Sequence, residues 1–96
     1  MSPYEETFNG YFDARRREMA CLACCSLHEV GAGARSPKLI AKEVCDGVKA
    51  GYLIICMAAN LDYNGAAKWF EAFKRGYLTD RLQEAIEKYR SNPQNA

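Results

Sequence analysis

The stretch that decides the fold of this chain is residues 36–60, SPKLIAKEVCDGVKAGYLIICMAAN. Ser36 is a favoured helix N-cap, because its hydroxyl accepts a hydrogen bond from a free amide of the first turn. Pro37 suits the first helical position, where a missing N–H has no cost. The apolar arc that follows comprises Ile40, Val44, Val48, Tyr52, Ile55 and Ala59. We predict a helix over residues 37–60, and its later half, apolar nearly all round, is predicted to be the central buried element.

Two glycines in this helix carry a further expectation. Gly47 and Gly51 lie four residues apart on one flank. A residue without a side chain lets another part of the chain come close. We therefore expect a neighbouring helix to approach this flank.

The N-terminal third repeats the same start signal. Ser2 and Pro3 mark a helix start, and Glu5 completes a capping box with Ser2. Gly31, in a glycine-rich run, is a natural left-handed cap for the other end. We predict a helix over residues 3–29, with one narrow apolar arc formed by Phe8, Phe12, Met19, Leu22 and Val30.

The C-terminal third predicts two shorter helices. Residues 62–65, Asp-Tyr-Asn-Gly, are typical of a turn. A third helix is expected over residues 66–75, where Ala66, Trp69, Phe70 and Phe73 recur at helical spacing. Thr79 and Asp80 are candidate caps of a fourth helix over residues 80–90, and Gly76 either ends the third helix or kinks a longer one. The polar tail 91–96 is expected to fray.

These elements predict an all-α protein, a compact bundle of about four helices. The 96 residues are enough for a single domain over 1–96, and the 49% hydrophobic content is that of a globular chain. A chain this short keeps much of its surface exposed, so a homodimer stays open as a way to bury more apolar area.

Composition also limits the location and the partners. The formal charge of +1 argues against a dedicated duplex-binding protein. The longest uncharged run, residues 50–61, is too short to span a bilayer, so no membrane partner is expected. The first residues, MSPYEETF, lack the basic and apolar regions of a secretory signal. We expect a cytoplasmic protein whose five cysteines are free thiols.

A cluster of cysteines and the single histidine is the one weak candidate for a metal site. Its members share one side of the first predicted helix: Cys21, Cys24, Cys25 and His28. Seven residues of helix rise about 10 Å, so one zinc ion could hardly reach both ends. The simpler interpretation is that these cysteines are small buried apolar residues, because free cysteine is among the most buried residue types. Nucleophilic catalysis by Cys24 or Cys25, with His28 as the base, would also need a group that orients the base, and Glu29 points elsewhere on the helix. We predict no metal site and no cofactor.

Basic and aromatic residues mark two candidate contact regions. One is the run Arg15, Arg16 and Arg17; the other contains Trp69, Lys74, Arg75 and Tyr77. Arginine, tyrosine and tryptophan carry much of the binding energy in protein interfaces. These seven residues are the predicted partner-binding set.

No phosphate-binding loop, dinucleotide fingerprint, metalloprotease motif or EF-hand loop occurs, so an enzyme is not predicted. The leading hypothesis is a small non-enzymatic module that binds another protein, as an adaptor, an inhibitor or a regulator. By analogy with other small proteins that lack motifs, it could be a phage or mobile-element inhibitor of a host system. The alternative is a nucleic-acid-binding regulator that uses a local basic patch. A second alternative is a zinc- or thiol-dependent protein that uses the cysteine cluster.

Overall fold

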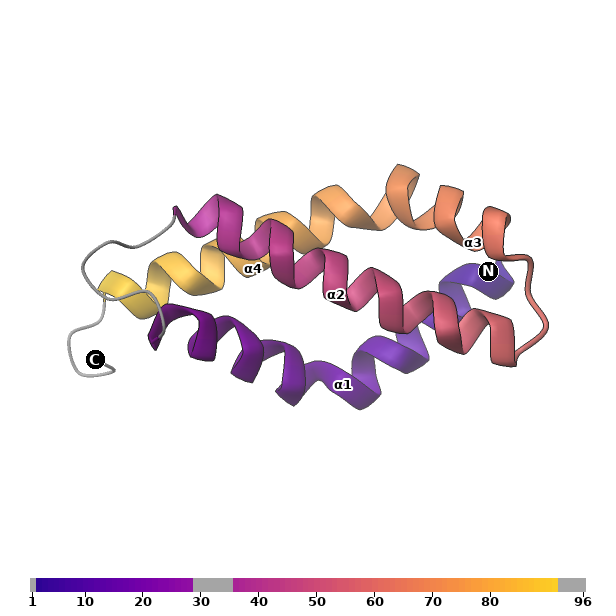
Figure 1. Cartoon of the computed structure of the whole chain (residues 1–96), viewed down its shortest axis with the longest axis horizontal. Helices are drawn as coiled ribbons and strands as arrows, with labels where there is room; N and C mark the ends of the chain where they lie inside the picture. Colours follow the sequence, from indigo (N-terminus) through magenta and orange to yellow (C-terminus); the bar gives the residue numbers. More distant parts are fainter. Residues whose placement is uncertain (1, 29–35, 92–96) are drawn as a thin grey trace.

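The computed structural model describes the backbone of residues 2–28 and 36–91, and the side chains of residues 2–19 and 36–88. Within these residues there is no strand, so the predicted all-α class is confirmed. The helical elements, in chain order, are α1 (Pro3–His28), α2 (Pro37–Ala58), α3 (Tyr63–Trp69), η2 (Phe70–Lys74) and α4 (Arg75–Ser91). The last three follow one another without a break and form one long bent helix (Figure 1).

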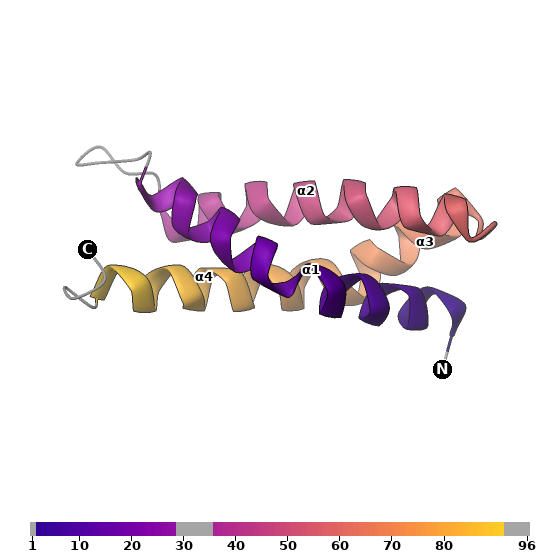
Figure 2. The same cartoon turned by 90° about the horizontal axis from the view of Figure 1, so that it is seen from below.

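The described helices pack side by side as three rods, with α1 and α4 running in one direction and α2 in the other. Figures 1 and 2 show α1 and α2 running in opposite directions, and α4 returning beside both along the long axis. Each of α1, α2 and α4 contacts the other two. The N-terminal turn of α1 lies at the same end of the molecule as α3. The molecule measures 44 × 20 × 20 Å, so its core is a narrow column between three helices.

Both serine caps form as predicted. The Oγ of Ser2 accepts a hydrogen bond from the Glu5 amide at 3.2 Å. The Oγ of Ser36 accepts one from the Leu39 amide at 3.3 Å. Helix α1 is described to His28, so the predicted last residue, Glu29, and the predicted cap at Gly31 lie outside the described residues. The tail 92–96 lies outside them as well.

Helix α2 ends two residues before the predicted position, because a tight cap closes it. The backbone of Asn60 is left-handed, with φ 60°. Its amide donates to the Met57 carbonyl at 3.0 Å, and the Leu61 amide donates to the Cys56 carbonyl at 2.9 Å. These are the two bonds of a Schellman motif, with asparagine in the position that glycine usually takes.

The C-terminal boundaries differ from the prediction. The expected turn at residues 62–65 is the first turn of α3, because the Asp62 carboxylate caps it by accepting from the Gly65 amide at 2.7 Å. The two helices expected over 66–75 and 80–90 are continuous, and Gly76 is helical. Thr79 does not start a new helix, since its hydroxyl donates to the Arg75 carbonyl at 2.7 Å within the existing one. The cap signals at Gly76 and Thr79 are therefore overridden, because the helical hydrogen bonds continue through these residues.

The bend contains one extra residue in a turn of π-helix. In this segment the Arg75 amide donates to the carbonyl of Phe70, which lies five residues earlier. In an α-helix the acceptor carbonyl lies four residues earlier. Residue i+7 of an α-helix faces nearly the same way as residue i, which would place Tyr77 under Phe70. The structure instead buries Leu78, eight residues after Phe70, and leaves Tyr77 53% exposed. The π turn therefore rotates the helix by one residue.

The core is centred on Tyr52 of α2. Its ring packs against Phe8 of α1, with centroids 5.6 Å apart, and against Trp69 and Phe70, each at 5.8 Å. Its buried hydroxyl donates to the Tyr4 carbonyl at 3.0 Å. Burial raises the pKa of Tyr52. One fully buried side chain thus joins α1, α2 and the bent helix.

The sequence predicted that the later half of α2 is the central buried element, but in the structure it is buried on one side and exposed on the other. Tyr52, Leu53 and Cys56 face the core, whereas Ile54 is 65% exposed and Met57 is 56% exposed. The exposure arises because α2 has two neighbouring rods, α1 and the bent helix. Its outer side has no partner among the described residues. An apolar outer face therefore accompanies the apolar inner face of α2.

Candidate partner-binding surface

Four of the predicted contact residues meet where α1 packs beside the bent helix. We call this place the basic–aromatic surface and define it by Phe12 and Arg16 of α1 together with Trp69, Phe73, Lys74, Tyr77 and Arg81 of the bent helix. Arg16, Trp69, Lys74 and Tyr77 belong to the predicted set. The sequence named them as two separate regions, and the packing of α1 against α4 brings them together.

Lys74 lies at the centre of this surface. Its Nζ is 5.3 Å from the ring centroid of Phe8, 5.4 Å from that of Trp69 and 5.8 Å from that of Tyr77. These distances are within the range of cation–π attraction, which each ring supplies through its negative face. The half-buried lysine is therefore held in place by three rings from two helices.

Two arginines flank this centre. Arg16 lies over Phe12, with Cζ 5.4 Å from the centroid, and pairs with Asp13 at 3.1 Å. Arg81 lies 5.5 Å from the Tyr77 centroid, and its Nε donates to the Tyr77 hydroxyl at 3.4 Å. The hydrogen bond and positive charge of Arg81 lower the pKa of Tyr77 from its ordinary value. The surface thus repeats one unit, a cation on an aromatic face.

Two hollows adjoin at Lys74. The first has a volume of about 320 Å³ and is mostly polar, lined by Asn9, Asp13, Arg16, Tyr77 and Lys74 over Phe8 and Phe12. The second, of about 490 Å³, is lined by Ser2, Glu5, Trp69, Phe73 and Lys74. Phe73 is 67% exposed at the edge of the second. A ligand that crosses Lys74 would meet charge on one side and aromatic rings on the other.

The π turn explains which residues this surface contains. Regular α-helical spacing groups Phe73 with Phe70, and on that ground the sequence placed Phe73 with the apolar core positions. The extra residue in η2 rotates the helix, so Phe73 lies outside while Phe70 remains buried. Phe12 was likewise assigned to the apolar arc, and the structure leaves its ring half-buried beneath Arg16. The sequence carries no local signal for the π turn.

The remaining predicted contact residues lie apart from this surface. Arg15 pairs with Glu18 of its own helix at 2.9 Å, and this carboxylate raises the pKa of Arg15. Arg17 is exposed on α1. The three arginines therefore fan around the helix, and Arg16 is the one that lines the hollow beside Lys74.

Arg75 points to a different neighbour, although it follows Lys74 in the sequence. Its guanidinium pairs with Asp46 of α2 at 2.6 Å and with Glu71 at 2.5 Å. Glu71 also pairs with Lys49 of α2 at 2.5 Å. Hydrogen bonds from Arg75 and Lys49 lower the pKa of Glu71 to about 2. Arg75 thus joins the bent helix to α2.

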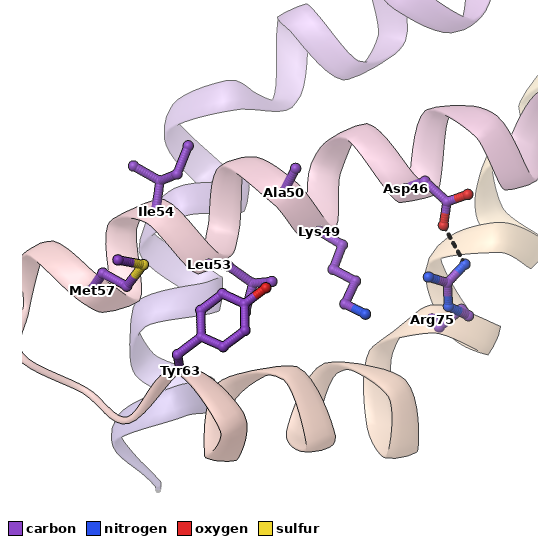
Figure 3. A pocket seen from close by; sticks show the side chains of 8 residues that line it. All are labelled: Asp46, Lys49, Ala50, Leu53, Ile54, Met57, Tyr63 and Arg75. Atoms are coloured by element: carbon purple, nitrogen blue, oxygen red, sulfur yellow. Dashed lines mark ion pairs between the residues drawn. The ribbon is translucent and has the colours of Figure 1, made fainter.

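A third hollow lies on the α2 side of the molecule. Its volume is about 420 Å³, and the apolar part of its lining comes from Leu53, Ile54 and Met57 of α2 and Tyr63 of α3 (Figure 3). Asp46, Lys49 and Arg75 line the other end, where the charges are paired as described above. Of the residues that line this hollow, the sequence named Arg75 alone as a contact, because it placed the later half of α2 in the core.

The thiols that the structure describes lie away from the predicted cysteine cluster in the sequence. The side chains of Cys21, Cys24, Cys25 and His28 lie outside the described residues. The described thiols are Cys45 and Cys56, both free and buried, and burial raises the pKa of Cys45. Across the side chains that are described, no three histidine, cysteine or carboxylate groups are grouped as metal ligands would be.

Searches for similar proteins do not identify a family. Comparison with protein-family models, with curated proteins and with solved structures found no match. Among the described helices, none combines the length and the apolar character needed to cross a bilayer.

Proposed function

We propose that this chain is a small non-enzymatic protein-binding module, an adaptor, inhibitor or regulator, and that the basic–aromatic surface binds its partner. The observation that carries the proposal is the position of Lys74, held between three rings beside two hollows. Lysine and aromatic side chains ordered before contact lose little conformational freedom on binding. Exposed Phe73 and Tyr77 add apolar area of the kind that marks interaction sites.

The charges near this surface favour a protein partner over a nucleic acid. Asp13 lines one hollow and Glu5 lines the other. Arg16 and Arg81 each have a carboxylate of the chain nearby, Asp13 at 3.1 Å and Glu84 at 3.9 Å. A run of phosphates would approach these carboxylates as well as the cations, which weakens the electrostatic attraction that dominates nucleic-acid binding. Protein interfaces commonly mix both signs of charge at their rims.

Crosslinking from the surface itself tests this proposal. A photo-crosslinking phenylalanine analogue replaces Phe73, whose exposure allows the change without loss of core packing. The control carries the analogue at Lys42, an exposed position on α2. Irradiation in cells of the source organism should join position 73, and not position 42, to one or a few proteins identified by mass spectrometry.

The same experiment can reject the proposal. Equal crosslinking from positions 73 and 42, or none from position 73, would remove its support. Crosslinks to RNA or DNA, together with oligonucleotide binding that weakens steeply with salt, would favour the nucleic-acid alternative. The zinc- or thiol-dependent alternative depends on side chains outside the described residues and stays a prediction, as do the cytoplasmic location and the homodimer.

A further inference from the structure

The cations of the basic–aromatic surface differ in how their charge is balanced. Arg16 has Asp13 at 3.1 Å, and Arg81 has Glu84 at 3.9 Å. For Lys74, none of the carboxylates in the described part of the chain lies within 4.0 Å; its neighbours are the rings of Phe8, Trp69 and Tyr77. Lys74, the central cation of the surface, thus has no acidic partner among the described residues.

The rings balance this charge only in part. An ammonium group has three N–H donors, and an aromatic face attracts the charge without offering an oxygen lone pair. Packing between rings also removes part of the water that would otherwise solvate a lysine. A carboxylate that reaches Lys74 would make a short, charge-assisted hydrogen bond with this partly desolvated ammonium group. The polar hollow of about 320 Å³ leaves room for one beside Lys74, because the hollow's own carboxylate, Asp13, is already paired with Arg16 at 3.1 Å.

The second hollow sets what must accompany that carboxylate. It shares Lys74 with the first hollow and offers the rings of Trp69 and Phe73, the latter mostly exposed. Glu5 lines it, which disfavours a second anion there. Resting on the proposed function, we infer that the partner is a protein segment with one acidic side chain and one large apolar side chain. The acidic group pairs with Lys74, and the apolar group covers Trp69 and Phe73.

Peptide selection tests this inference with a defined probe. Random peptides of about 12 residues, long enough to cross both hollows, are displayed on phage and selected on the full chain. The selected sequences should be enriched in aspartate or glutamate close to an aromatic or large aliphatic residue. The tightest peptide is then synthesised and titrated by calorimetry.

Matched variants then assign the contact. Lys74→Met keeps a long flexible stem among the rings and removes the charge, and it should weaken the peptide by about tenfold or more. Lys42→Met, on the exposed side of α2, should leave the affinity unchanged. Exchanging the peptide's acidic residue for its amide should cause a similar loss on the wild type and little further loss on Lys74→Met, because the two groups form one pair.

Three results would overturn the inference. Selected peptides without acidic enrichment would do so, as would unchanged affinity in Lys74→Met, or a selection that yields no binder. None of these touches the crosslinking result from position 73, so the acidic anchor can fail while the protein-binding function stands. Tight binding of a single-stranded oligonucleotide that depends on Lys74 would overturn both.

Discussion

At the scale of single residues, the two glycines of α2 that look alike in the sequence have different surroundings. A Cβ built on Gly51 would lie 2.2 Å from the hydroxyl of Tyr11 in α1, whereas one built on Gly47 meets nothing within 4 Å. The predicted close approach of a neighbouring helix is therefore confirmed at Gly51 and wrong at Gly47. The difference arises because Gly51 faces α1 and Gly47 faces outward.

This contrast gives a matched pair of variants. Gly47→Ala should stabilise the protein by about 0.5–1 kcal/mol, since alanine favours the helix and has free space. Gly51→Ala should lose that gain or destabilise the protein, because Tyr11 must move. Urea denaturation followed by circular dichroism measures both.

Removing the hydroxyl of Tyr11 supplies the control for this pair. In the Tyr11→Phe background, Gly51→Ala should be better tolerated than in the wild type, because the atom nearest to the new methyl group is gone. Equal effects of the two glycine substitutions in the wild type would contradict the close contact.

The carboxylate of Glu71 gives a pH dependence whose direction follows from its pKa. Arg75 and Lys49 lower this pKa from 4.5 to about 2, so the pairing stabilises the folded protein above pH 4.5. That contribution is lost as the pH falls from 4.5 toward 2, because the unfolded chain takes up the proton more readily. The side chain is 42% exposed, so water limits the contribution to about 1 kcal/mol.

Denaturation of wild type and Glu71→Gln at neutral pH and near pH 2 measures this effect. The wild type should be more stable at neutral pH, and the difference should shrink in acid. Glu87→Gln is the control, at a carboxylate that accepts a hydrogen bond from the uncharged Gln83. A difference between wild type and Glu71→Gln that is constant with pH would show that the network contributes nothing through ionisation.

At the scale of elements, the π turn in η2 is the feature that the sequence could not predict. Caps depend on a few local residues, and the starts of α1 and α2 were accordingly predicted within a residue. A π turn forms when packing on both sides demands a register that a regular helix cannot provide. Phe70 and Leu78, eight residues apart, are both fully buried, and only one extra residue lets them share a face.

Deleting a residue tests that interpretation. Removal of Ala72, an exposed residue of η2, should turn the π turn into α-helix and leave both Phe70 and Leu78 in the core. We expect this variant to fold, with far-ultraviolet circular dichroism and thermal midpoint close to those of the wild type. Removal of exposed Glu84 in α4 should instead rotate buried Ile86 outward and cost about 2–4 kcal/mol.

The two deletions together test whether the extra residue in η2 sets the register of the bent helix. If removal of Ala72 unfolds the protein as readily as removal of Glu84, the extra residue is not the cause of the register shift. If both variants are as stable as the wild type, the core does not depend on register in this helix.

At the scale of the whole molecule, the sequence predicted the all-α class, and it named four of the seven residues that form the basic–aromatic surface. Capping serines, apolar periodicity and short connections are enough for an all-α bundle. The sequence also named Arg16, Trp69, Lys74 and Tyr77 as contacts. It could not show that Arg16 meets Lys74, because the two residues are 58 positions apart and only the packing of α1 on the bent helix brings them together. Nor could it separate Lys74 from Arg75, which face different helices.

The position of Trp69 has a practical consequence. It is the single tryptophan of the chain, and its indole lies beside Lys74 and Phe73, where we place the partner. Indole emission responds to nearby charge and to displacement of water, so the protein carries its own optical reporter at the contact point. A titration can therefore be followed in a fluorimeter without attaching any dye.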